Sequence, residues 1–425
     1  MAVEVTRLEN GLTVVTDAMP HLQTISVGVW VNTGARHEGQ HQHGVSHLLE
    51  HMAFKGTERR SARAIAEEIE NVGGHLNAHT AHEATAYYAR VMKGDLPLAV
   101  DLLSDILQNS TFEKSELERE RGVVIQEIGQ TLDTPDDLVF DHLLDAAYPG
   151  QAMGRTILGT VETVQGFDRN ALKTYMDERY QAPGMVLAAA GAIDHAELVA
   201  LGRDSFSTLL QRKSNGAAPA SFTGGERRET RDLEQAHVTL AFEGPAYGDP
   251  DFYTSQIFSS VLGGGMSSRL FQEVREKRGL AYSVFAFGWS FADTGIMGVY
   301  AATAPDDLAE LMPVVANEIS RLGDDATEVE VARARAQMKA GLLMGLESSS
   351  SRAEQIARQY AVHGRVLPID EMISKVDEVD AAAVRRFAGR FLGPDAKAPA
   401  LAAVGPLAGA GGGLESYDRL AARFG

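Results

Sequence analysis

The sequence predicts an α+β protein made of two similar halves. Strand-like and helical stretches are mixed without the regular strand–helix alternation of a doubly wound sheet, which favours an α+β fold. A shift of about 214 residues also superimposes 113–128 on 327–342 with the helical pattern kept. We therefore expect two related domains at 1–211 and 231–425. Between them we expect a linker at 212–230, where Ser, Asn, Gly, Ala, Pro and charged residues replace the periodic pattern.

Hydrophobic periodicity and punctuation residues predict the elements of the first half. Val, Ile and Thr are typical of its strands, and Ser61 and Gly73 are placed as the N-cap and the stop of one helix. In chain order, the predicted elements are strands at 11–16 and 24–32, helices at 44–54 and 62–72, a hairpin of 76–78 with 85–92, and helices at 95–109 and 113–132.

The second half is expected to repeat this plan. Its predicted elements are strands at 238–242 and 295–302 and helices at 307–322 and 328–347. The same shift superimposes five ionisable residues of the first half on apolar or small ones: His47 on Val261, Glu50 on Gly264, His51 on Gly265, Glu120 on Ala334 and Glu127 on Gly341. This pattern indicates a duplication in which only the first copy keeps chemistry at these positions.

Composition narrows the range of functions. With 39 Lys and Arg against 58 Asp and Glu the formal net charge is −19, which argues against DNA or RNA because phosphate backbones need cationic side chains. There are no cysteines, so thiolate nucleophiles and iron–sulfur clusters are excluded, and any metal must be held by His, Asp or Glu. No apolar run approaches the ~20 residues of a membrane span, and the first residues lack the pattern of a secretory signal. We expect a cytoplasmic protein with neither a nucleic-acid nor a membrane partner.

A metal-binding pattern lies in the helix predicted at 44–54. His47 and His51 are four residues apart, so one helix face can present both imidazoles to a single ion. Glu50 follows His47 by three residues and can act on a metal-bound water. The order His-x-x-Glu-His is found in one class of zinc peptidases. His75 and His79, which alternate with small apolar residues, are possible rival ligands.

A third ligand is expected from the helix predicted at 113–132. Glu120 and Glu127 are seven residues apart and therefore share one helix face. One of the two can bind the metal while the other orients a ligand histidine by a hydrogen bond.

Together with these motifs, further segments make the chain similar to a known family. Glu127 follows His51 by 76 residues, as in the pitrilysin-type (inverzincin) zinc peptidases. The segments that agree in order are Gly73–Ala78, Thr85–Tyr88, Glu120–Glu127, Gly154–Gly159, Leu262–Leu270 and Arg275–Tyr282. The resemblance covers Leu8 to about Phe391. It is closest to a bacterial subfamily similar to mitochondrial processing peptidase.

The resemblance implies a role for each motif residue. It implies one Zn²⁺ per chain held by His47, His51 and Glu127. Glu50 is then the general base, and Glu120 the carboxylate that supports the site. Asn77 and Ala78 lie on the edge strand that binds substrate, and Arg275 and Tyr282 are the pair that steadies the substrate carbonyl. From the residues alone, the favoured interpretations are a solvated helix charge for Arg275 and a packed strand aromatic for Tyr282.

The resemblance also implies an architecture and an activity. Each domain is expected to be an antiparallel-rich sheet packed with helices, and the two domains together to form half of a clamshell. A homodimer would complete it, with Arg275 and Tyr282 acting in trans. The expected function is a zinc-dependent endopeptidase that hydrolyses unfolded peptides or extended protein segments, with the zinc-bound water activated by Glu50. The alternatives are a catalytically silent assembly or scaffold subunit, and a zinc hydrolase of a non-peptide amide.

Overall fold

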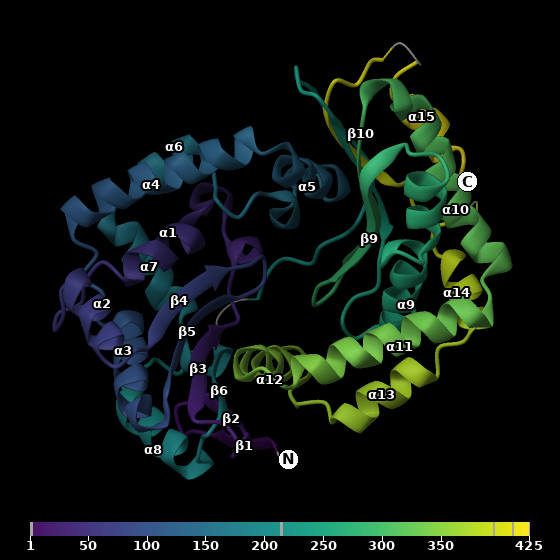
Figure 1. Cartoon of the computed structure of the whole chain (residues 1–425). Helices are drawn as coiled ribbons and strands as arrows, with labels where there is room; N and C mark the ends of the chain where they lie inside the picture. The colour runs from purple at the N-terminus through teal and green to yellow at the C-terminus, as the bar shows by residue number, and fades with distance from the viewer. Residues whose placement is uncertain (1–2, 213–215, 394–395, 410–411, 425) are drawn as a thin grey trace. The chain divides into compact units, whose positions relative to one another are not determined.

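The protein consists of two compact α+β units, as the computed structural model shows for residues 3–212, 216–393, 396–409 and 412–424. Unit 1 consists of the described residues within Met1–Gly129, Thr156–Ala218 and Leu343–Leu367; unit 2 consists of those within Gln130–Arg155, Pro219–Leu342 and Pro368–Gly425 (Figure 1). Each unit is one sheet packed with helices, so the predicted fold class is confirmed. Neither unit is a continuous stretch of chain.

Unit 1 is built on a six-stranded sheet in the order β1-β2-β6-β3-β5-β4. Its pairs are antiparallel except β2 with β6. The strands are β1 Val3–Arg7, β2 Thr13–Ala18, β3 Thr24–Val31, β4 His75–Thr80, β5 Thr85–Met92 and β6 Met185–Gly191. The helices are α1 Val45–Ala53, α2 Ala62–Asn71, α3 Leu96–Gln108, most of α4 Lys114–Asp133, α6 Val161–Gly166, α7 Arg169–Arg179, α8 His195–Ser205 and α12 Ser349–His363.

Both faces of this sheet are covered, which explains its continuous apolar strands. Alternate residues of β3 divide between the faces: Val27 and Val29 pack in the large core with α1 and α3, and Trp30 packs against α12. A buried ion pair anchors α12 to the sheet, with Arg352 Nε donating to Asp17 Oδ2 of β2 at 2.5 Å.

Unit 2 has a five-stranded sheet in the order β7-β11-β8-β10-β9, with only β7 and β11 parallel among its pairs. The strands are β7 Gly225–Thr230, β8 Ala236–Glu243, β9 Ala281–Ser290, β10 Gly295–Thr303 and β11 Ala400–Gly405. The helices are α5 Pro135–Ala147, α9 Phe252–Gly263, α10 Leu308–Asp325, most of α11 Glu328–Gly345, α13 Ile369–Asp377, α14 Ala381–Ala388 and α15 Tyr417–Ala421, with a π-helical turn at Phe271–Glu276.

The two sheets share one plan, as the predicted duplication requires. The order β2-β6-β3-β5-β4 of unit 1 corresponds strand by strand, with the same directions, to β7-β11-β8-β10-β9 of unit 2. The predicted shift holds for α4 and α11, where buried Leu117 and Glu120 match buried Val331 and Ala334. It fails for α1 and α9, because α9 ends at Gly263 and the positions predicted to match Glu50 and His51 lie beyond that end.

The units exchange a helix. After α4 of unit 1, the next helix, α5, packs on β7, β8 and β11 of unit 2; after α11 of unit 2, the next helix, α12, packs on β2, β3 and β6 of unit 1 (Figure 1). Each sheet is thus covered on one face by a helix that continues from the other unit. Of the predicted linker at 212–230, residues 213–215 lie outside the described part of the chain, and 225–230 form β7.

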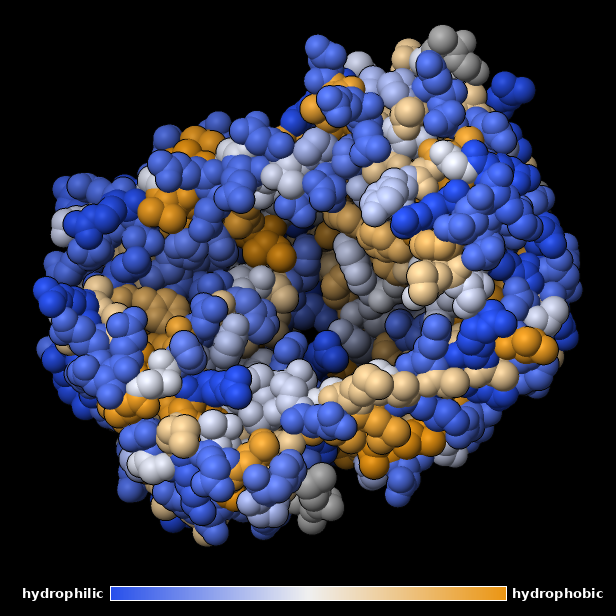
Figure 2. Space-filling model, viewed as in Figure 1, coloured by the Kyte–Doolittle hydropathy of each residue, from blue (hydrophilic) through white to orange (hydrophobic). Residues whose placement is uncertain are grey.

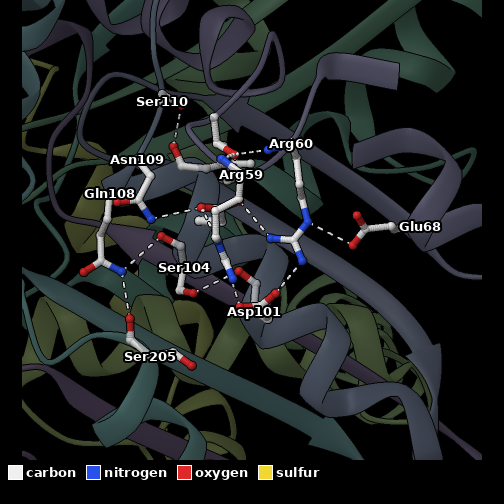
Figure 3. A network of polar contacts seen from close by, with 12 residues as sticks. Arg59, Arg60, Glu68, Asp101, Ser104, Gln108, Asn109, Ser110 and Ser205 are labelled. Atoms are coloured by element: carbon white, nitrogen blue, oxygen red, sulfur yellow. Dashed lines mark hydrogen bonds and ion pairs between the residues drawn. The ribbon is translucent and has the colours of Figure 1, made fainter. Parts of the chain in front are cut away.

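The predicted elements are present with ends shifted by a few residues. Ser61 caps α2 as expected, its Oγ accepting a hydrogen bond from the N–H of Ala64 at 3.1 Å. The loop before α2 is fixed to α3 by charged side chains (Figure 3). Arg59 and Arg60 both donate to Asp101, and Arg60 also donates to Glu68 at 2.9 Å.

The surface agrees with the acidic composition. On the face shown in Figure 2, hydrophilic side chains predominate on the outer surface of both units, with hydrophobic ones scattered among them. Within the described residues, no helix has both the length and the apolar character needed to cross a membrane.

Candidate metal centre

Helix α1, which carries the His-x-x-Glu-His motif, begins at a fixed point. Gly44 has a φ of +91°, and a Cβ there would lie 2.6 Å from the carbonyl oxygen of Leu158, so this turn requires glycine. The buried carboxylate of Glu38 accepts hydrogen bonds from the N–H groups of Gly44 and Ser46, both at 2.8 Å. A carboxylate at this end also complements the helix dipole. The start of α1, and with it the motif one turn later, is therefore held in place.

Three predicted ligands converge at one point. Helix α1 buries an apolar stripe against the core, which turns His47 and His51 to the opposite side. Glu127 of α4 reaches both imidazoles, with its Oε2 lying 3.6 Å from Nε2 of His47 and 3.5 Å from Nε2 of His51. The ligand atoms of the three residues all lie within 4.8 Å of one another. Two imidazoles and one carboxylate form a donor set that suits a catalytic zinc ion with an open position.

Glu120, the other predicted site carboxylate on α4, supports one of these histidines. Glu120 is buried, and its Oε2 lies 3.2 Å from Nδ1 of His51. A hydrogen bond there leaves Nε2 of His51, the nitrogen that faces Glu127, free for a metal. The other oxygen of Glu120 contacts Nζ of Lys55 at 2.9 Å. An ordered chain of contacts thus runs from Lys55 through Glu120 to His51.

Glu50 lies beside the ligands and is held by the sheet. Thr80, the last residue of β4, donates its hydroxyl to Oε2 of Glu50 at 2.6 Å. Burial raises the pKa of Glu50, while the Thr80 hydrogen bond opposes the rise. A carboxylate with a raised pKa is better suited to accept a proton near neutral pH.

The electrostatics of His47 fit a metal ligand. Burial, helped by the neighbouring His51, lowers the pKa of His47 to about 4. The imidazole is therefore neutral at physiological pH, as metal coordination requires. Its buried Nδ1 has no hydrogen-bond partner among the described residues.

Strand β4 is the edge of the sheet on this side. Asn77 and Ala78, predicted to bind substrate, lie in its middle, and the N–H of Ala78 donates to Oδ1 of Asn77 at 2.9 Å. The possible rival ligands His75 and His79 line a cavity on the sheet face that packs against α12, whereas Thr80 points to Glu50 on the other face.

Arg275 and Tyr282 lie in unit 2 and contact each other. Arg275 is in the π-helical turn, a feature often found at functional sites, and Tyr282 is near the start of edge strand β9. The guanidinium carbon of Arg275 lies 4.1 Å from the ring centroid of Tyr282, and Nη1 donates to the Tyr282 carbonyl at 3.0 Å. Tyr282 is 77% exposed, so it is not the packed strand aromatic that its sequence context alone suggests.

Two residues of the site, Lys55 and Thr80, are not among those that the sequence predicts, although each carries a signal. Lys55 follows His51 by four residues, the spacing of neighbours on one helix face, but it lies just beyond the end of α1. Thr80 has the same parity as Ala78 on β4, which in a strand means the same sheet face.

The comparisons with known proteins agree with this geometry. Residues 13–161 match the insulinase family, peptidase family M16, and residues 166–338 match the M16 inactive domain. The chain is 38% identical to an uncharacterized zinc protease of Rickettsia bellii, over 95% of this chain and 97% of that one. It is 40% identical to the mitochondrial-processing peptidase subunit beta of Mus musculus, over 95% of this chain and 84% of that one.

Solved structures show the same fold. A protease from Helicobacter pylori superimposes with a TM-score of 0.87 at 22% identity, over 95% of this chain and 99% of that one. A chain of complex III2 from Candida albicans superimposes with a TM-score of 0.86 at 25% identity, over the full length of both. The sequence matches, the duplicated fold and the His-His-Glu cluster lead to one conclusion: the chain belongs to peptidase family M16, the insulinase family of zinc metalloproteases.

Proposed function

We propose that this zinc peptidase is an endopeptidase that cleaves unfolded peptides or extended protein segments bound along β4. The proposal depends on one observation: strand β4 contacts the candidate general base at its end and offers an open sheet edge in its middle. Its last residue, Thr80, holds Glu50 beside the three candidate ligands, and its middle residues, Asn77 and Ala78, lie at an open sheet edge. A peptide added to this edge would pass close to Glu50.

Residues of this chain have distinct roles in the proposed mechanism. His47, His51 and Glu127 hold one zinc ion, with Glu120 orienting His51. When bound, zinc lowers the pKa of its water and polarises the scissile carbonyl. Glu50 would take a proton from the attacking water as the water oxygen bonds to the scissile carbonyl carbon, and would pass that proton to the amine nitrogen as the C–N bond breaks.

Main-chain pairing accounts for a broad substrate class. In this proposal, a carbonyl of the incoming peptide replaces Oδ1 of Asn77 as the acceptor for the N–H of Ala78. Strand addition obtains its affinity from backbone hydrogen bonds and needs no strict side-chain code. Because the Asn77 side chain satisfies that N–H without substrate, it also protects the edge from pairing with other strands.

Arg275 and Tyr282 supply donors for the developing oxyanion. Their mutual contact and the exposure of Tyr282 support a role at a surface that meets substrate. Removing one such donor from an active site costs roughly 3 kcal/mol of transition-state stabilisation. We propose that the pair acts in trans within a homodimer in the cytoplasm, since one chain carries both the zinc motif and the donor pair.

Zinc analysis and a peptide digest test the activity. Purified chain should contain one zinc per chain and cleave a quenched peptide library at internal bonds, with products read by mass spectrometry. Glu50→Gln should keep the metal and lose cleavage. A wild type that binds zinc yet cleaves no peptide, or a fully active Glu50→Gln, would refute the proposal. The two alternatives, a silent subunit and a hydrolase of a non-peptide amide, are not favoured by the family assignment.

Subunit mixing tests the trans arrangement. Glu50→Gln chains and Arg275→Ala chains are each expected to be inactive as homodimers. Mixed after subunit exchange, they should regain part of the activity because one intact site forms per heterodimer. No recovery, with exchange verified by differently tagged chains, would contradict the arrangement. Fractionation of cells that express a tagged chain tests the location.

A further inference from the structure

A strained residue lies just before the helix that carries Glu120 and Glu127. Phe112 has a φ of +48°, and within the described part of the chain it is the one residue other than glycine with a positive φ. This left-handed conformation is uncommon for a bulky side chain and costs free energy. Such residues persist where the surrounding structure imposes them, and they cluster at functional sites. The strain at Phe112 therefore indicates that its surroundings require this conformation.

The residues before Phe112 are tied to the end of α1. The Ser110 hydroxyl donates to the carbonyl of Ala53, the last residue of α1, at 3.3 Å. Thr111 donates both its N–H and its hydroxyl to the carbonyl of Gly56, at 3.1 and 3.3 Å. The chain that enters Phe112 is thus held against the helix that carries the two candidate histidine ligands.

The residues after Phe112 form the helix that carries the third candidate ligand. The N–H of Leu117 donates to the carbonyl of Glu113 at 2.9 Å, so the helical hydrogen bonds of α4 begin at the residue that follows Phe112. The Phe112 side chain is 3% exposed and lies in the same core cluster as Leu117 of α4 and Leu48 of α1. Phe112 is therefore the junction between a segment fixed to α1 and helix α4, and its φ sets the direction in which α4 leaves.

The direction of α4 matters because the candidate ligands come from two helices. Glu127 follows Phe112 by 15 residues, which is about 22 Å along a helix axis. A turn of α4 by about 10° at the junction would move Glu127 by about 4 Å if nothing compensated it. Glu127 Oε2 lies only 3.5 and 3.6 Å from the two imidazoles, so a shift of this size would separate the ligands.

We propose that Phe112 is a positioning residue for the metal centre. Its left-handed backbone aims α4 so that Glu120 and Glu127 reach the histidines of α1, and its buried ring holds that backbone in place. Phe112 contacts neither metal nor substrate and acts through α4. Glycine would adopt the same φ without strain, but it would leave the junction flexible and the core unfilled. The inference rests on the zinc site proposed above.

Two isomeric side chains test the role of the backbone conformation. Leu and Ile have the same volume, but the β-branched Ile tolerates a positive φ much less well. Competition with a fluorescent zinc chelator gives the zinc Kd of each apo chain. Phe112→Leu should bind zinc within about twofold of wild type, and Phe112→Ile about tenfold more weakly, because relief of the strain turns α4 away. Equal affinities of the two variants, or a weaker Phe112→Leu, would overturn the proposal.

Phe206 provides the matched control. Its side chain is likewise buried in the core of unit 1, but it follows α8 with an ordinary φ of −111°. Phe206→Leu and Phe206→Ile should both lose stability and bind zinc equally well. A difference between them as large as that between the two Phe112 variants would show that branching acts through general destabilisation, and the proposal would fail.

Hydrogen exchange separates this inference from the zinc site. Mass spectrometry follows amide exchange in the first turns of α4, at 114–123, in chains kept free of metal by a chelator. Phe112→Ile should exchange about tenfold faster there than wild type, and Phe112→Leu at nearly the wild-type rate. This result supports the junction even if the wild type binds no zinc. Unchanged exchange in Phe112→Ile overturns it even if zinc is bound. Circular dichroism confirms that each variant is folded.

Discussion

Lys55 is expected to tune the metal site through Glu120, without touching the metal. Its Nζ lies 2.9 Å from Glu120, which in turn contacts His51. Two unit charges at this distance attract by roughly 6 kcal/mol at an effective dielectric constant of about 20. Desolvation and solvent access offset most of this, since the Lys55 side chain is 31% exposed. We therefore expect the Lys55–Glu120 contact to contribute about 1–2 kcal/mol net to zinc binding.

Lys55→Met is expected to weaken zinc binding about tenfold, which corresponds to about 1.4 kcal/mol. Without the ammonium group, Glu120 loses the contact that fixes one of its oxygens, and its hydrogen bond to His51 loosens. A competition titration of the apo chain with a fluorescent zinc chelator measures the Kd. Lys55→Arg should bind nearly as well as wild type, because it restores a donor.

A double-mutant cycle decides whether Lys55 acts through Glu120. Glu120→Gln should weaken zinc binding by about 10- to 100-fold, and adding Lys55→Met should then change little. Lys114→Met, at an exposed position of α4, is the control for loss of one positive charge. Full additivity of the two changes, or a Lys55→Met chain with wild-type affinity, would refute the reasoning.

Four further outcomes follow from the structure. Arg352→Met should lower the free energy of unfolding in urea by about 3 kcal/mol, because it leaves Asp17 buried and unpaired, and adding Asp17→Asn should recover part of the loss. Burial and nearby Asp137 raise the pKa of Asp141 to about 6, so the folded state holds this proton more tightly than the unfolded state does. Asp141→Asn should therefore stabilise the chain by about 1–3 kcal/mol at pH 7.5, and the gain should vanish as the pH falls through 6 towards 4 in parallel denaturation curves. Ser61→Ala should cost about 1 kcal/mol by loss of the N-cap, and Ser61→Gly less, as thermal melts would show. Chelation should abolish peptide cleavage and lower Tm. Added zinc at 1,000 times its Kd should raise the free energy of unfolding of the chelated chain by about 4 kcal/mol. A chelated chain with unchanged Tm would argue against a metal at this site.

Local elements were predictable because their signals are local. The apolar stripe of α1, with Val45, Leu48, Leu49 and Met52, is buried as its spacing indicates. The shared face of Glu120 and Glu127 on α4 also follows from helix geometry alone. The meeting of His47, His51 and Glu127 joins two helices, and no local pattern reports the distance between them.

The assignment of helices to units could not be read from the sequence. The ion pair between Asp17 and Arg352 joins residues 335 positions apart. Neither residue lies in a sequence pattern that indicates its partner, so the sequence predicts a single division at 212–230. Likewise, Lys55 reaches Glu120 only because the chain turns just after α1, and the sequence marks the end of the helix without marking where the next side chain points.

The exchange of α5 and α12 has a consequence for synthesis of the chain. The first sheet has all six strands once β6 has left the ribosome, yet the face holding Val15, Trp30 and Ala86 stays uncovered until residues 349–363 emerge. A nascent chain therefore carries an apolar sheet face through the synthesis of most of unit 2. Chaperones that shield such faces should bind the growing chain in this interval and release it when α12 docks.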